Sequence, residues 1–215
     1  MEQKELDALW QLNALVMIEP LPAKLDLAYM VSTSDDAAEP IIENAKKLKK
    51  IYPKIKVALA AYKEPSIYCG HKTWPEQLKE NYKPEEIFII DMPSNHKQPI
   101  NTFTEMNYLY QLFLSHDNIG FWVNNICLVA AQFHQLRSYI SLVSVLFKNH
   151  NYPDYPDYYK VCNFISSPAD WSDIVTHSQG TVRASRCELL LNERDRIIKY
   201  YKKGDLIAPS KVLDY

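Results

Sequence analysis

The chain has 215 residues, of which 47% are hydrophobic and 23% are charged, and its formal net charge at pH 7 is −2. These values are ordinary for a soluble globular domain, and the length favours one domain over residues 1–215 rather than two. The slightly acidic balance argues against nucleic-acid binding, which requires a clustered basic excess. We therefore expect a small-molecule ligand or a protein partner.

Several other classes of protein are disfavoured by features that the sequence lacks. No apolar stretch approaches the roughly 20 residues that cross a bilayer, and the acidic first seven residues do not resemble a signal peptide. The four cysteines are widely spaced, which disfavours structural zinc. Only four glycines are present, and neither a GxGxxG loop nor a P-loop can be written from them. The sequence thus predicts a cytoplasmic protein with no membrane span and no metal site.

Strand-like and helix-like segments alternate along the chain. In order, we predict an N-terminal helix within residues 1–20, a strand over 25–31, a helix over 41–51, a strand over 55–61, a short helix over 74–82 with Pro75 in its first turn, a strand over 87–91, a helix from 101 or 102 to 114, a strand over 125–130, a helix over 135–147, a strand over 159–165, a long loop to Gly180 and a C-terminal helix within 181–204.

Each predicted strand is continuously apolar, which is typical of a parallel sheet that is buried on both faces. Strands that alternate with helices and connect by right-handed crossovers form a doubly wound arrangement. The sequence therefore predicts an α/β fold with a Rossmann-like, mostly parallel five-stranded sheet and helices on both faces. Ligands of such sheets bind at the carboxyl ends of the strands.

The segment 125–137 ends an apolar strand and begins a helix with a histidine and an arginine. His134 and Arg137 are three residues apart, so they share a face of that helix. A histidine can transfer protons near neutral pH, and an arginine can bind a carboxylate or a phosphate. We predict that both are functional, although a histidine in this position can also be a hydrogen-bonded structural residue.

Polar residues also follow two other strands. Ser32, Ser34 and Asp35 come after the first strand and could accept or donate hydrogen bonds to a ligand, or could cap the next helix. Asn101, Thr102 and Glu105 begin the helix that follows the third strand, where a helix cap and a ligand contact are both possible. We expect these two groups to converge with His134 and Arg137 around one hollow.

A further pair, His177 and Arg183, flanks the predicted start of the last helix. This segment could close over a ligand, or it could be a loop that caps the helix.

Three motifs resemble the YdcF–SanA–ElyC family of bacterial α/β proteins. Asp26 and the apolar run after it are similar to the opening Asp-x-hydrophobic strand of that family, and Asn101-Thr102 resembles its Asn-Thr-x-Glu-Asn helix start. Residues 128–137, Leu-Val-Ala-Ala-Gln-Phe-His-Gln-Leu-Arg, are similar to its Leu-Val-Thr-Ser-x-Tyr-His-x-x-Arg segment. The chain departs from the family at 32–34, where paired glycines are usual, and at Thr104, where a glutamate is usual.

The resemblance implies a Rossmann-like fold and, through the soluble YdcF branch, binding of S-adenosylmethionine. Other members are membrane-anchored and linked to the maintenance of cell-envelope precursors. The resemblance carries a functional role to His134 and Arg137, and to Asn101 and Thr102.

Three functions follow as alternatives. The first is a small-molecule-binding protein for S-adenosylmethionine or another nucleotide-like ligand, with Arg137 at a carboxylate or phosphate and Asp35 at hydroxyl groups. The second is a hydrolase or transferase that acts on a phosphorylated or glycan envelope precursor, with His134 as general acid or base and Arg137 stabilising negative charge. The third is a non-catalytic interaction protein with a vestigial cleft.

Overall fold

The computed structural model describes residues 1–18, 20–62, 70–92, 101–114, 123–149, 159–165, 170–177 and 181–215. Its elements, in chain order, are α1 (Gln3–Ile18), β1 (Leu27–Met30), η1 (Asp35–Ala37), α2 (Glu39–Ile51), β2 (Lys56–Tyr62), α3 (Gly70–Leu78), η2 (Pro84–Glu86), β3 (Ile87–Met92), α4 (Thr102–Leu114), β4 (Asn125–Val129), η3 (Gln132–His134), α6 (Gln135–Asn149), β5 (Lys160–Asn163), β6 (Ile174–His177), β7 (Val182–Ser185), α7 (Arg186–Lys203) and α8 (Pro209–Leu213).

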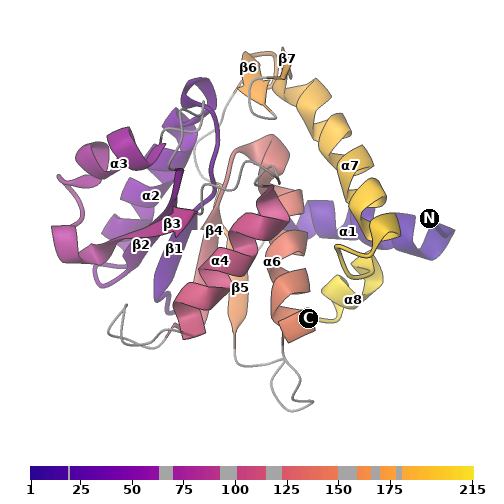
Figure 1. Cartoon of the computed structure of the whole chain (residues 1–215), viewed down its shortest axis with the longest axis horizontal. Helices are drawn as coiled ribbons and strands as arrows, with labels where there is room; N and C mark the ends of the chain where they lie inside the picture. The colour runs from indigo at the N-terminus through magenta and orange to yellow at the C-terminus, as the bar shows by residue number, and fades with distance from the viewer. Residues whose placement is uncertain are drawn as a thin grey trace.

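The centre of the fold is a five-stranded parallel sheet with the order β3-β2-β1-β4-β5 (Figure 1). Its middle strand, β1, is buried at every residue because helices cover both faces. The predicted α/β, doubly wound, Rossmann-like sheet is confirmed. The order in which strands are added to the sheet reverses between β1 and β4, because β2 and β3 lie on one side of β1 whereas β4 and β5 lie on the other, and this switch point is where sheets of this class bind ligands.

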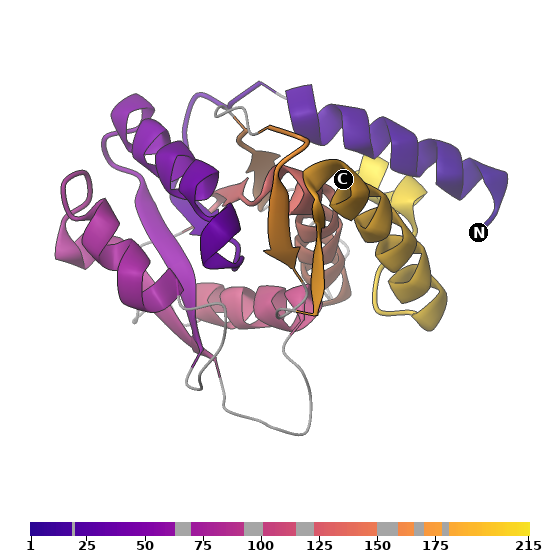
Figure 2. The ribbon, with the colours of Figure 1, turned by 90° about the horizontal axis from the view of Figure 1, so that it is seen from above.

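The helices form one layer on each face of the sheet (Figure 2). On one face α2 and α3 pack their apolar side chains against β1 and β2, around Ile41, Leu48 and Leu78. On the other face α4 and α6 pack against the sheet, and Leu109, Phe113 and Leu142 belong to this second apolar cluster. A third apolar cluster joins α1, α6, α7 and α8. The described helices include none that is both long and apolar enough to cross a membrane.

The C-terminal region differs from the prediction. The predicted helix over 181–204 begins only at Arg186, because residues 182–185 form β7 and pair antiparallel with β6. Ser185 caps α7: its hydroxyl accepts a hydrogen bond from the backbone N–H of Glu188, and the Glu188 carboxylate accepts one from the backbone N–H of Ser185. This reciprocal pair is a capping box. The other end is as predicted: Gly204 ends the helix with a φ of 83°, a left-handed conformation that glycine adopts without strain.

Two smaller corrections concern the predicted long loop and the short helix. The loop that was expected to reach Gly180 contains β6. The helix predicted over 74–82 is α3, which begins at Gly70 and ends at Leu78, so Pro75 lies inside the helix rather than in its first turn. Helical period and proline position alone did not locate this start.

Candidate functional site at the carboxyl edge of the sheet

Two buried polar clusters lie at the carboxyl ends of the central strands. The first, here called the histidine cluster, consists of His134, Arg137, His177, Glu193 and Arg196. The second, here called the Glu105 cluster, consists of Glu105, Tyr29, Tyr62 and Ser32. Both clusters contact α4, whose first turn carries Thr102 and Glu105 one helical turn apart.

The turn between β4 and α6 places His134. The side chain of Gln135 holds this turn: its carbonyl oxygen accepts a hydrogen bond from Ala130 N at 2.9 Å, and its amide donates to Leu128 O at 3.0 Å. The same amide donates to Asn163 Oδ1 at 2.6 Å and so joins the ends of β4 and β5. Because Gln135 is fully buried and its bonds replace backbone pairing at the strand end, the position of the neighbouring His134 is closely defined.

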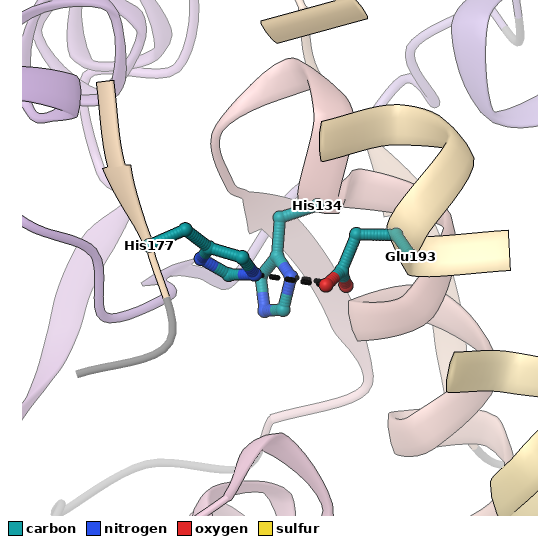
Figure 3. A group of neighbouring side chains, drawn as sticks. All are labelled: His134, His177 and Glu193. Carbon is teal, nitrogen blue, oxygen red and sulfur yellow. Dashed lines mark hydrogen bonds and ion pairs between the residues drawn. The ribbon is translucent and has the colours of Figure 1, made fainter. Parts of the chain in front are cut away.

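Glu193 of α7 is the centre of the histidine cluster (Figure 3). Its carboxylate lies 2.7 Å from His134 Nδ1 and 2.8 Å from His177 Nε2, and its side chain is 1% exposed. Arg196 Nη1 donates to it at 2.9 Å, and Arg137 Nε donates to the other oxygen. One carboxylate therefore joins η3, α6, β6 and α7.

The charge states in the histidine cluster follow from burial and from the arginines. Burial alone would raise the pKa of Glu193, but the neighbouring Arg137 charge and the hydrogen bonds from His134 and His177 hold it well below the ordinary value. Burial, with the nearby Arg137 charge, lowers the pKa of His134 to about 4. At neutral pH Glu193 is thus ionised and His134 is neutral.

These charge states decide which ring nitrogen of His134 carries the proton. An ionised carboxylate only accepts hydrogen bonds, so the short contact to Glu193 requires the proton on Nδ1. Nε2 is then an acceptor, and it lies 3.1 Å from Thr102 Oγ1. The Thr102 hydroxyl therefore donates its hydrogen bond to His134.

The Glu105 cluster is built around a carboxyl group that is 3% exposed. Tyr29 OH donates to it at 2.6 Å and Tyr62 OH at 3.1 Å, and both the backbone N–H and the hydroxyl of Ser32 lie 3.1 Å from it. Burial raises the pKa of Glu105 despite these four donors. Burial and the Glu105 charge in turn raise the pKa of Tyr29 well above its ordinary value.

The β6–β7 hairpin covers the carboxyl end of β1 (Figure 1). Ser34 Oγ lies 2.5 Å from Thr176 O, and Thr176 N donates to Asp36 at 2.8 Å. The hairpin is held at its other side by the contact of His177 with Glu193. The expected loop around His177 and Arg183 is therefore a strand pair that closes this edge of the sheet.

The segments predicted to converge do meet. Ser32 contacts Glu105, and Thr102 contacts His134, although 73 and 32 residues separate the partners. The groups form a packed network rather than the expected open hollow, since His134 is 5% and Arg137 6% exposed.

The other predicted site residues have local roles. Asn101 caps α4 by accepting a hydrogen bond from Thr104 N at 3.0 Å. Ser34 faces the hairpin, and Asp35 is exposed in η1. Arg137, which was expected to face a ligand, instead binds Glu193.

Sequence reasoning missed four members of these clusters: Glu193, Arg196, Tyr29 and Tyr62. Tyr29 is one of four residues in an apolar strand, and nothing in its neighbourhood marks its hydroxyl as functional. Glu193 and Arg196 are three residues apart on α7, which is also the spacing of ordinary surface ion pairs. Only the packing of α7 against η3 distinguishes them.

Asn163 at the end of β5 was also missed. Its Oδ1 accepts from Gln135, while its buried amide nitrogen has no partner among the described residues.

His134, His177 and Glu193 also have the spacing of a metal site, with ligand atoms within 4.8 Å of one another. Two imidazoles and a carboxylate are a donor set that zinc and non-haem iron accept. However, Arg137 Nη2 lies 3.2 Å from His134 Nδ1, and Arg196 Nη1 lies 2.9 Å from His177 Nε2. A metal cation would have to displace both guanidinium groups, so we describe this group as an ion-pair network.

No match is found when the chain is compared with protein-family models, curated proteins and solved structures. The resemblance to the YdcF–SanA–ElyC family therefore stays a prediction, and functional inference depends on the geometry of the two clusters.

Proposed function

We propose that this chain binds a small nucleoside-like ligand at the carboxyl edge of its parallel sheet, and that S-adenosylmethionine is the ligand to test first. One observation carries the proposal: buried polar and charged side chains gather at this edge. They are Thr33, Ser34, Thr102, Glu105, His134, Gln135, Arg137, Asn163, His177 and Glu193. Burying charge is costly and brings little stability in return, and concentrations of such groups with shifted pKa values are typical of functional sites.

The amide nitrogen of Asn163 is a second observation in favour of a ligand site at this edge of the sheet. Buried polar atoms nearly always have a hydrogen-bond partner, and this donor has none among the described residues. Turning the amide over would place its nitrogen against the nitrogen of Gln135, which removes the 2.6 Å hydrogen bond between them. A ligand acceptor at the end of β5 would satisfy the donor.

The charges near the site favour S-adenosylmethionine over a nucleotide polyphosphate. Arg137 and Arg196 both bind Glu193, so its carboxylate offsets their positive charge and weakens their attraction for a phosphate. Asp35 lies exposed at the end of β1, the central strand. S-adenosylmethionine carries sulfonium and ammonium groups beside one carboxylate, and a carboxylate side chain attracts the first two.

Calorimetric titration with S-adenosylmethionine, S-adenosylhomocysteine, adenosine and ATP tests the proposal. We expect S-adenosylmethionine to bind most tightly, because S-adenosylhomocysteine lacks the sulfonium charge. At a hundredfold excess over its Kd, it should stabilise the fold by about 2.7 kcal/mol. Asp35→Asn should weaken binding.

Asp26→Asn is the matched control. Asp26 is also an aspartate next to β1, but it directly precedes that strand and so lies at the amino end of the sheet. There its carboxylate accepts hydrogen bonds from Asn124 N and Asn125 N. This variant should change stability and leave binding unchanged. The proposal is wrong if none of the four compounds binds, which would favour the interaction-protein alternative, or if ATP binds more tightly than S-adenosylmethionine.

A further inference from the structure

A threonine, a histidine and a glutamate form a continuous hydrogen-bonded chain across three elements. Thr102 Oγ1 of α4 lies 3.1 Å from His134 Nε2 of η3, and His134 Nδ1 lies 2.7 Å from a carboxylate oxygen of Glu193 in α7. Thr102 is 6% exposed, His134 5% and Glu193 1%, so the carboxylate is the most deeply buried member of the chain. The chain is hydroxyl, imidazole and carboxylate, in the order of a hydrolase triad.

The protonation states agree with that order. Glu193 is ionised and accepts from Nδ1–H, which orients the ring and leaves the lone pair of Nε2 directed at the hydroxyl. In triads of this kind the carboxylate fixes the tautomer and stabilises the imidazolium that forms, while Nε2 takes the proton of the nucleophile. Arg137 is held by Glu193 on the far side of the ring from Thr102, so it does not block the hydroxyl.

We propose that Thr102 is the nucleophile of an acyl-transfer reaction on carboxylic esters, with His134 as general base and acid and Glu193 as the positioning residue. Thr102 is the first residue of α4, a helix of 13 residues. The positive dipole end of this helix therefore lies beside the hydroxyl, where it would stabilise the oxyanion of a tetrahedral intermediate, although Thr104 N and Glu105 N donate to Asn101.

The reaction has two balanced steps. In the first, Thr102 Oγ1 attacks the ester carbonyl carbon and passes its proton to His134 Nε2; the bond to the leaving alcohol breaks, and His134 returns the proton to the alkoxide. In the second, a water molecule attacks the acyl-threonine while its proton passes to Nε2. The acyl–Oγ1 bond breaks, the proton returns to Thr102 Oγ1, and a carboxylic acid is released.

Acyl transfer fits this geometry better than phosphoryl transfer. Phosphoryl transfer needs cations on the equatorial oxygens of the phosphoryl group, and both arginines of the histidine cluster bind Glu193. Acyl transfer needs only N–H donors for one oxyanion.

The test uses p-nitrophenyl acetate with the full chain and follows nitrophenol release and the acetylated residue by peptide mass spectrometry. We expect transient acetylation of Thr102. Thr102→Val, which keeps the shape of the side chain, should abolish it, and Thr102→Ser should retain it. His134→Gln should slow release by about a hundredfold or more. Glu193→Gln should lower the pH needed for half-maximal rate, because the imidazolium loses its counter-charge and the pKa of His134 falls further.

Thr104→Val is the matched control, since Thr104 lies on the same turn but its hydroxyl contacts Asn101 rather than a histidine. This variant should react like the wild type. The inference is overturned if Thr102 of the wild-type chain is never acetylated, or if Thr102→Val releases nitrophenol at the wild-type rate. It does not depend on the identity of the nucleoside-like ligand, so titration of Thr102→Val with S-adenosylmethionine distinguishes the two proposals.

Discussion

The pH dependence of stability should reveal the buried, neutral state of His134. Burial and Arg137 lower its pKa to about 4 from the ordinary 6.5. The unfolded chain therefore binds a proton at pH values where the folded chain does not, and stability must fall as the pH falls. Each unit between the two pKa values is worth about 1.4 kcal/mol. About 3 kcal/mol that is present above pH 6.5 should be lost by pH 4.

The assay is urea unfolding of the wild type and of His134→Gln at pH values from 4 to 7. Glutamine keeps a donor and an acceptor but does not titrate in this range, so the difference between the two curves isolates the histidine. Other groups contribute to each curve separately. The raised pKa of Glu105 makes stability fall as the pH rises above 4.5, and the lowered pKa of Glu193 makes it fall as the pH drops below 4.5.

We expect the wild type to lose about 3 kcal/mol relative to His134→Gln across this window. Parallel curves would refute the reasoning, because they would mean that His134 titrates alike in the folded and unfolded chains. A wild type that gains stability relative to the variant on acidification would show a charged imidazole instead. Glu105→Gln serves as the control: in this variant, the loss of about 3 kcal/mol that is caused by His134 between pH 6.5 and pH 4 should remain.

Four further outcomes are expected. Glu193→Gln should destabilise the fold by about 3–5 kcal/mol in chemical denaturation, because two arginines lose a buried counter-charge, whereas the exposed Asp195→Asn should change stability by less than about 0.5 kcal/mol. Tyr29→Phe should cost about 1–3 kcal/mol by removing a donor from buried Glu105. Gly204→Ala should lower the melting temperature, at a cost of about 1–2 kcal/mol, because its φ of 83° strains a residue with a Cβ. Zinc or a chelator should leave the melting temperature unchanged if the arginines hold Glu193 as described.

The parallel sheet could be predicted from the sequence because its central strands are short apolar runs. Such runs at 27–30 and 125–129 are buried on both faces, and the residues after them must lie at one edge. That is why Ser32, Thr102 and His134 could be expected to lie near one another before any contact was known.

The hairpin and the centre of the site could not be predicted in the same way. Val182–Ser185 is only four residues long and is followed directly by α7. The helix predicted from the residues of α7 was therefore extended over this strand. Glu193 lies 59 residues from His134, and their contact depends on how α7 packs rather than on any local spacing. The partners of Arg137 and Ser34 could not be foreseen for the same reason, since Glu193 and Thr176 are distant from them in the sequence.

The placement of Glu193 so late in the chain bears on how the protein folds during its synthesis. When the ribosome has released only residues up to the end of β5, all five strands of the parallel sheet are present, but His134 and Arg137 still lack their carboxylate. A nascent intermediate that ends there would keep a solvated arginine at its carboxyl edge. The edge is completed only when α7 emerges, so a chain that stops before residue 186 should retain much of the sheet and still be unable to assemble the site.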